Sequence, residues 1–95
     1  MNDSAVALRR AALAFLAARR PGIYAARQVV ERLNASGLLD APATLADVER
    51  ALALLAQPRM GLLSLEVDPL SSIVYFGATA EGVKQWTLDG RMTVD

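Results

Sequence analysis

The residue types that carry most enzyme chemistry are scarce in this chain of 95 residues. It has no histidine and no cysteine, which removes the commonest general base, the commonest metal ligand and the thiolate nucleophile. Asp47 and Glu49 are two residues apart on an expected helix, so their carboxylates point to different helix faces. No glycine-rich phosphate loop is present in the sequence. We therefore expect no catalytic residue, no metal site and no cofactor.

Arginine is the remaining residue type with anion-binding chemistry. Residues 1 to 20 carry four arginines against Asp3, whereas the chain from residue 61 onward is mainly acidic. The formal net charge is zero, unlike the strongly basic balance typical of a dedicated nucleic-acid binder. The four arginines are Arg9, Arg10, Arg19 and Arg20. We interpret them chiefly as solvated helix ends, although the uneven charge also suits head-to-tail contact between two copies or an anion at the basic end.

Length and composition predict a single domain over residues 1–95. A chain of this size buries roughly 65% of its unfolded surface, which is sufficient for one core. Apolar residues make up 54% of the chain, and alanine and leucine dominate over the few aromatic residues. Because alanine and leucine favour helices, we expect a mainly helical core. The mean hydropathy of +0.29 is high for a small domain, so part of the apolar surface is expected to meet a partner.

The first helix is predicted to begin at Asp3 or Ser4, both good N-cap residues, and to end at Pro21. At about 100° per residue, its larger apolar side chains share one side, which we expect to be the core face. These are Val6, Leu8, Leu13, Phe15 and Leu16. A stripe of small residues lies on the other side. It consists of Ala7, Ala11, Ala14 and Ala18.

Two further helices follow. The second is predicted over residues 25–34, with Gly37 near its C-terminal cap. Thr44 followed by Asp47 forms a capping box, so a third helix is expected to begin at Leu45 and to end before Pro58. Its inward face is expected to comprise Leu45, Val48, Leu52 and Leu55. Its outward face is expected to comprise Ala46, Asp47, Arg50, Ala53, Leu54 and Gln57.

The pattern then changes to that of strands. Apolar and polar residues alternate over 63–67, residues 68–72 have turn chemistry, and residues 73–76 are β-branched and aromatic, which predicts a β-hairpin. Thr79 is expected to cap a short last helix that carries Trp86 and ends near Gly90. The fold class is therefore α+β, with three helices followed by a hairpin and a short helix. No internal repeat or interdomain linker is evident.

This order of elements resembles the winged-helix domains that are common among bacterial transcription regulators. The most specific match is the segment Tyr-Phe-Gly-Ala-Thr-Ala-Glu-Gly at residues 75–82, which is similar to the way such domains leave the hairpin, or wing, and start the next helix. Ala78 stands where an aliphatic residue is usual. The resemblance implies a winged-helix fold and double-stranded DNA as a partner. The absence of cysteine, and hence of disulfides, makes the cytoplasm the expected location.

In that family the third helix enters the major groove and the wing contacts the DNA backbone or minor groove. The resemblance implies that Arg50 and Gln57 read bases, that Arg27 contacts the DNA backbone, and that Thr44 belongs to the same DNA-binding surface. It also gives a positioning role to Ser71 and Ser72 in the wing turn. A surface arginine with no role in DNA binding is an equally good interpretation of Arg27.

The sequence also departs from this family pattern. Asp47 would repel phosphate, Leu54 presents an apolar outward patch, and Glu66 and Asp68 flank the wing turn. No lysine or arginine lies between residues 60 and 83. We therefore consider two functions to be almost equally supported by the sequence. One is a DNA-binding regulator, and the other is a winged-helix module for protein interaction or self-assembly without DNA binding.

For either function we expect a homodimer or a protein partner. The interface is predicted at six positions: Ala7, Ala11, Ala14, Ala18, Leu54 and Trp86. Small side chains let helices approach closely, although a solvated alanine face is an equally good interpretation, and Trp86 suits the core as well as an interface. No apolar run approaches the length of a membrane span. The run 11–18 after Arg9 and Arg10 resembles a short signal peptide, but we interpret it as part of the first helix.

Overall fold

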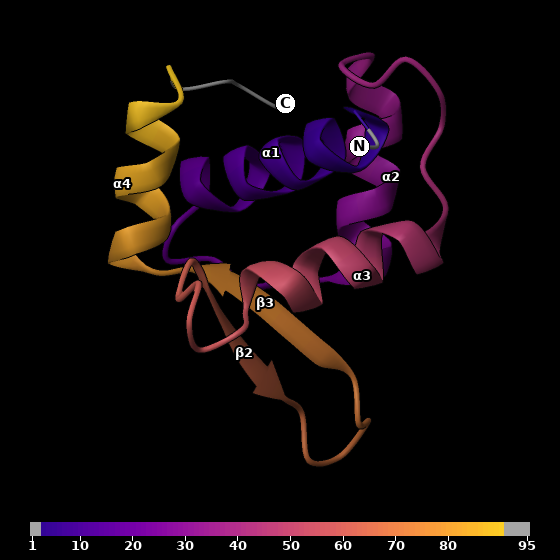
Figure 1. Cartoon of the computed structure of the whole chain (residues 1–95). Helices are drawn as coiled ribbons and strands as arrows, with labels where there is room; N and C mark the ends of the chain where they lie inside the picture. Colours follow the sequence, from indigo (N-terminus) through magenta and orange to yellow (C-terminus); the bar gives the residue numbers. More distant parts are fainter. Residues whose placement is uncertain (1–2, 91–95) are drawn as a thin grey trace.

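The computed structural model describes residues 3–90 and has an α+β fold. Within these residues, four helices pack together at one end of a small antiparallel sheet, and the hairpin of the sheet extends away from the helices (Figure 1). The helices are α1 (Asp3–Ala18), α2 (Ala26–Ser36), α3 (Leu45–Leu55) and α4 (Ala80–Leu88). The strands are β1 (Tyr24–Ala25), β2 (Leu63–Val67) and β3 (Val74–Ala78). Within residues 3–90, no helix is both long enough and apolar enough to cross a membrane.

The sheet has the order β1-β3-β2, and both of its pairings are antiparallel. The hairpin predicted from the alternating pattern is confirmed, with Leu65 opposite Phe76 in the register of β2 and β3. The pairing of β1 with β3 was not predicted. Residues Tyr24–Ala25 pair with Tyr75 and Phe76, and a two-residue strand is too short to give an alternating signal in the sequence.

Helix α1 runs through the middle of the helical layer and packs against α2, α3, α4 and β3 (Figure 1). Every residue from Ala11 to Ala17 is buried. The expected core side is confirmed for Leu8, Leu13, Phe15 and Leu16, which are buried, but the expected surface stripe is wrong at its two central positions. Ala11 and Ala14, which were assigned to the surface stripe, are each 1% exposed. The reason is that neighbours cover α1 from several directions, and the small alanine side chains let them approach.

The inward face of α3 differs from its prediction at one end. Val48, Leu52 and Leu55 are buried as expected, and Ala51 is buried with them. Leu45, which was expected in the core, is 37% exposed. It is the first helical residue, and its angular position places it at the border of the buried face rather than at its centre. The helix begins where the capping box predicted and ends at Leu55, a little before Pro58.

Helix α4 is tied to the base of the hairpin by its own cap. Thr79 Oγ1 accepts a hydrogen bond from the Gly82 N–H at 3.0 Å and donates one to the Gly61 carbonyl at 2.6 Å. The Thr79 N–H donates to the Leu62 carbonyl at 3.1 Å. Gly82 is buried in this contact, and a Cβ built on it would overlap the Leu62 carbonyl. The absence of a side chain at Gly82 therefore permits the close approach of α4 to the residues that precede β2.

We predict that Gly82→Ala destabilises the protein although alanine is the better helix former. The gain in helix propensity is about 1 kcal/mol, whereas forcing a methyl group against backbone atoms typically costs about 1–3 kcal/mol. Urea unfolding should therefore show a net loss of stability of up to about 2 kcal/mol. Lys84→Ala, at an exposed position of the same helix, is the matched control and should change stability little. A Gly82→Ala variant more stable than the wild type would contradict the close contact with Leu62.

Candidate nucleic-acid interface

Two features of the segment between α2 and α3 fix the position where α3 begins. Gly37 ends α2 in the left-handed conformation, with φ of 75°, which glycine adopts without strain. Asn34 then holds the connecting segment at both hydrogen-bonding groups of Ala43. Its Nδ2 donates to the Ala43 carbonyl at 3.0 Å, and its Oδ1 accepts from the Ala43 N–H at 2.8 Å. This clamp brings Thr44 to the N-cap position of α3.

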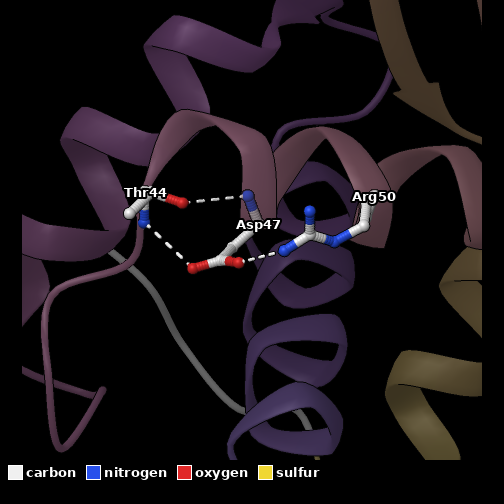
Figure 2. Close-up of polar contacts among 3 residues, drawn as sticks. All are labelled: Thr44, Asp47 and Arg50. Atoms are coloured by element: carbon white, nitrogen blue, oxygen red, sulfur yellow. Dashed lines mark hydrogen bonds and ion pairs between the residues drawn. The ribbon is translucent and has the colours of Figure 1, made fainter.

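The first turn of α3 contains a connected polar group of three residues, shown in Figure 2. Thr44 Oγ1 accepts from the Asp47 N–H at 3.1 Å, and the Thr44 N–H donates to Asp47 Oδ2 at 3.4 Å. The predicted capping box is therefore confirmed. The other Asp47 oxygen accepts a hydrogen bond from Arg50 and forms an ion pair with it. Asp47 thus serves both the helix cap and the arginine that was expected to read DNA bases.

The pKa of Asp47 lies below its usual value of 3.8. Hydrogen bonds from the Thr44 side chain and backbone are the main causes, and attraction to Arg50 adds to them. These interactions favour the ionised carboxylate. Arg50 therefore faces a fully charged partner at neutral pH, although its side chain remains 73% exposed.

An open groove of about 810 Å³ runs along the outward flank of α3. Its walls are the start of α1, residues 39–43 and α3 itself. Arg50, Leu54 and Gln57 from α3 and the turn after it line this groove together with Ala7 and Arg9. The groove thus brings together Arg50 and Gln57, which were expected to contact DNA, with Leu54 and Ala7, which were expected at a protein interface. The groove itself was not predicted, because it depends on how α1 crosses α3.

Arg27, Arg19 and Arg20 differ in whether their side chains are engaged in contacts within the chain. Arg27 is exposed on the first turn of α2 and stays a candidate for a phosphate contact. Arg19 donates to the Phe15 carbonyl at 3.1 Å and lies over the Phe15 ring, with its guanidinium carbon 4.0 Å from the ring centre. Arg20 Nε donates to the Ala78 carbonyl at 3.2 Å. Arg19 thus packs back on α1 itself, whereas Arg20 ties the segment after α1 to β3.

The wing turn is organised around Asp68. Asp68 accepts hydrogen bonds from the Leu70 N–H at 3.0 Å and from the Ser71 hydroxyl at 2.9 Å, and the same two residues lower the pKa of its carboxyl group. Ser71 also accepts from the Ile73 N–H at 3.2 Å. Ser72 is exposed and has a positive φ of 62°. The hydroxyl of Ser71 is thus engaged beside a carboxylate, an unfavourable setting for a phosphate contact.

The six residues expected at an interface do not form one surface. Ala7 and Ala18 are exposed, whereas Ala11 and Ala14 lie in the core. Leu54 is half-buried and lines the groove on α3, and Trp86 is half-buried on α4 and packs against the core. The alanine stripe is therefore not a continuous surface of the single chain, because its two central members are covered by neighbouring elements.

One exposed apolar surface was missed by the sequence analysis. Leu65, Val67 and Leu70 of the wing are exposed by more than half of their surface. The signal was present in the alternation of residues 63–67, since apolar residues on one side of a hairpin imply a face that needs covering. Among residues 3–90, no group of three or more carboxylates gathers in a way that would hold a metal ion.

Comparison with known proteins identifies the fold. No protein-family model matches the chain, and no curated protein matches its sequence. The solved structure of ZitR from Lactococcus lactis, a winged-helix regulator determined in apo form as a double mutant, superposes with a TM-score of 0.66 at 18% identity. The match covers 93% of this chain and 58% of the ZitR chain. This chain therefore has the winged-helix fold, and it spans little more than half the length of that regulator.

The capping box gives a testable pH dependence. Because the pKa of Asp47 is lowered on folding, its stabilising contribution is present above pH 3.8 and is lost as the pH falls through the folded-state pKa. Asp47→Asn should therefore be less stable than the wild type at neutral pH, and the difference should shrink on acidification below pH 3.8. Urea unfolding of both proteins at several pH values measures this. A difference that persists unchanged at low pH would exclude the carboxylate charge as its cause.

Proposed function

We propose that this chain is a winged-helix DNA-binding module of the transcription-regulator type, with α3 as the helix that enters the major groove. The observation that carries the proposal is the exposed Arg50 on the outward side of α3, in a fold of the winged-helix class. An arginine at such a position reaches the O6 and N7 atoms of guanine with two hydrogen bonds. In this proposal the winged-helix fold presents α3 to the major groove, and the guanidinium group of Arg50 donates the hydrogen bonds to the base.

Gln57 and Arg27 complete the proposed contact surface. Gln57 lies seven residues after Arg50, about two helical turns along the same side, and it is exposed in the turn after α3. An amide side chain suits the N6 and N7 atoms of adenine. Arg27 at the start of α2 provides a phosphate contact, whereas Thr44 is a weaker candidate because the Asp47 carboxylate lies at the same helix N-terminus. Ser71 and Ser72 remain candidates for weaker backbone contacts.

The charges around α3 imply weak and salt-sensitive binding. Phosphate affinity comes from cations that displace counterions, and Asp47 neutralises the arginine best placed on α3. The wing adds Glu66 and Asp68 and no basic residue. Binding to duplex DNA therefore depends on a small number of arginines, which makes each of them testable by substitution.

The first test measures duplex binding by fluorescence anisotropy at about 50 mM salt, where a protein that makes several phosphate contacts binds strongly. Arg50→Ala should weaken binding through loss of a base contact, by about 1–3 kcal/mol on its preferred sequence. Arg27→Ala should reduce the slope of log affinity against log salt by about 0.9, as expected for one lost phosphate contact. Lys84→Ala on α4 is the control and should bind as the wild type does. No binding of the wild type to duplex DNA at this salt concentration would exclude the proposal.

The second test releases Arg50 from its ion pair. Asp47→Asn keeps a side chain of similar size at the same position but removes the charge that holds Arg50. We expect tighter DNA binding than for Glu49→Gln, which removes an equal charge from the same helix and leaves the Asp47–Arg50 pair in place. If both variants gain affinity equally, the effect is one of net charge alone, and Arg50 does not carry the contact.

A second candidate function is supported by the apolar side chains of the surface. Leu54 lies in the groove on α3, and the wing exposes apolar residues beside acidic ones. A surface of this kind suits a protein partner better than a phosphate backbone. A winged-helix module that joins protein chains, with α3 and the wing as contact elements, is therefore the alternative that the first test separates from DNA binding.

A further inference from the structure

The wing presents apolar side chains beyond the part of the sheet that covers the core. Leu63 at the base of β2 is 3% exposed, whereas Leu65 and Val67 on the same side of the strand are 52% and 54% exposed. The hairpin extends away from the helices (Figure 1), so among residues 3–90 no helix or other strand covers the outer half of this face. Burial of such side chains against another chain would be favourable.

The same strand has a free hydrogen-bonding edge. β2 lies at the end of the order β1-β3-β2, and in residues 3–90 no strand pairs along its other side. Hydrogen bonds from Asp68 N–H to the Ile73 carbonyl and from Thr79 N–H to the Leu62 carbonyl bracket the ladder with β3. Because these groups alternate along an antiparallel pair, the even-numbered residues of β2 face β3. The N–H and C=O groups of Leu63, Leu65 and Val67 therefore point outward.

The strand also lacks the features that usually protect such an edge. Natural edge strands are commonly blocked by lysine, by proline or by a bulge. The sequence of β2 is Leu-Ser-Leu-Glu-Val, and its register with β3 is continuous from Leu63 to Val67. The backbone N–H and C=O groups of its single charged residue, Glu66, point toward β3, where Glu66 lies opposite Tyr75. The outward edge is thus open to pairing.

We propose that β2 pairs in antiparallel orientation with β2 of a second copy of this chain, with the two-fold axis at Leu65. In this register Leu65 pairs with Leu65 of the second copy, and Leu63 faces Val67 on either side. Every outward N–H and C=O group of the strand then meets a complementary group. The exposed side chains of Leu65 and Val67 become cross-strand neighbours on one face. The two three-stranded sheets join into one continuous sheet.

The charges favour this register and a second copy as the partner. With the axis at Leu65, Glu66 lies opposite Ser64 of the other copy, so like charges are kept apart. Moving the axis to Glu66 would place two carboxylates directly opposite each other, which is destabilising. The antiparallel arrangement also brings the acidic tip of one wing, with Asp68, toward the base of the other, where Arg59 is exposed. The strand is therefore complementary to itself in hydrogen bonding, apolar contact and charge.

This inference rests on the fold alone and is independent of DNA binding. The proposed contact consists of two short strands, so the interface is small and the association is expected to be weak, with a dissociation constant in the micromolar range or above. It also differs from the dimer that the alanine stripe of α1 suggested, because it uses the wing.

The experiment that tests the proposal combines solution mass with cysteine cross-linking. Sedimentation of the full chain, from low micromolar to submillimolar concentration, should show the mass rising from one chain of 10.1 kDa toward twice that value. Leu65→Pro removes an N–H that faces outward and leaves the ladder with β3 intact, a setting in which edge strands accept proline. This variant should stay at the mass of one chain. Leu70→Lys is the control, since it removes the most exposed apolar residue of the wing outside the paired segment and should still dimerise.

Cross-linking keeps the proposal testable even if Leu65→Pro does not fold. The chain has no cysteine, so one introduced cysteine can form a disulfide only with its counterpart in another copy. Leu65→Cys places the two Cα atoms about 5.5 Å apart in a hydrogen-bonded pair, within disulfide range. Val67→Cys is equally exposed but lies four residues out of register with its counterpart, roughly 13 Å along the strand. Leu65→Cys should therefore form the disulfide dimer under a mild oxidant, and Val67→Cys should not.

Three outcomes would overturn the proposal. The first is a wild type that remains at the mass of one chain at the highest concentration, and the second is a folded Leu65→Pro variant that dimerises as the wild type does. The third is equal cross-linking of Leu65→Cys and Val67→Cys, or of neither. Absence of duplex binding by the wild type would leave all of these results unaffected, so failure here and failure of the proposed function are distinguishable.

Discussion

The close packing around α1 is the constraint on which the rest of the structure depends. Four alanines between Ala11 and Ala17 are almost fully buried, and their small side chains let α2, α3, α4 and β3 all reach the same helix. Larger residues at these positions would push the neighbours outward, because protein interiors leave little spare volume. The orientation of α3, and therefore the side chains that α3 exposes, follows from this packing. The contact of Gly82 with Leu62 extends the same principle to α4 and the wing.

At the start of α3, the carboxylate that caps the helix also pairs with the arginine proposed to contact DNA. A helix N-terminus needs hydrogen-bond acceptors, and the Thr44–Asp47 pair provides them. An acidic residue at the third helical position also complements the helix dipole. The same carboxylate, however, lies one turn from Arg50 and holds it in an ion pair. The helix is thereby well capped, and its cationic character toward DNA is reduced.

The wing has a chemistry distinct from that of α3. Its base joins the core through Leu63 and Phe76, and its tip closes through hydrogen bonds to Asp68. Between these two ends the strand carries apolar side chains and a free edge and no basic residue. The molecule thus separates two kinds of surface, the outward side of α3 with its Asp47–Arg50 pair and the apolar strand of the wing. This separation allows the two proposed roles to coexist in one small domain.

The sequence by itself determined the features that depend on local chemistry. Thr44 and Thr79 as helix caps, Gly37 as the end of α2 and the hairpin about residues 68–72 follow from hydrogen bonds and backbone preferences within a few residues. The tertiary structure alone decided which surfaces are exposed. The burial of Ala14, the exposure of Leu45 and the pairing of Tyr24 with Phe76 depend on contacts between segments far apart in the chain. The periodicity of a helix gives its faces but not the number of neighbours that cover them, and α1 is covered on more sides than its pattern indicates.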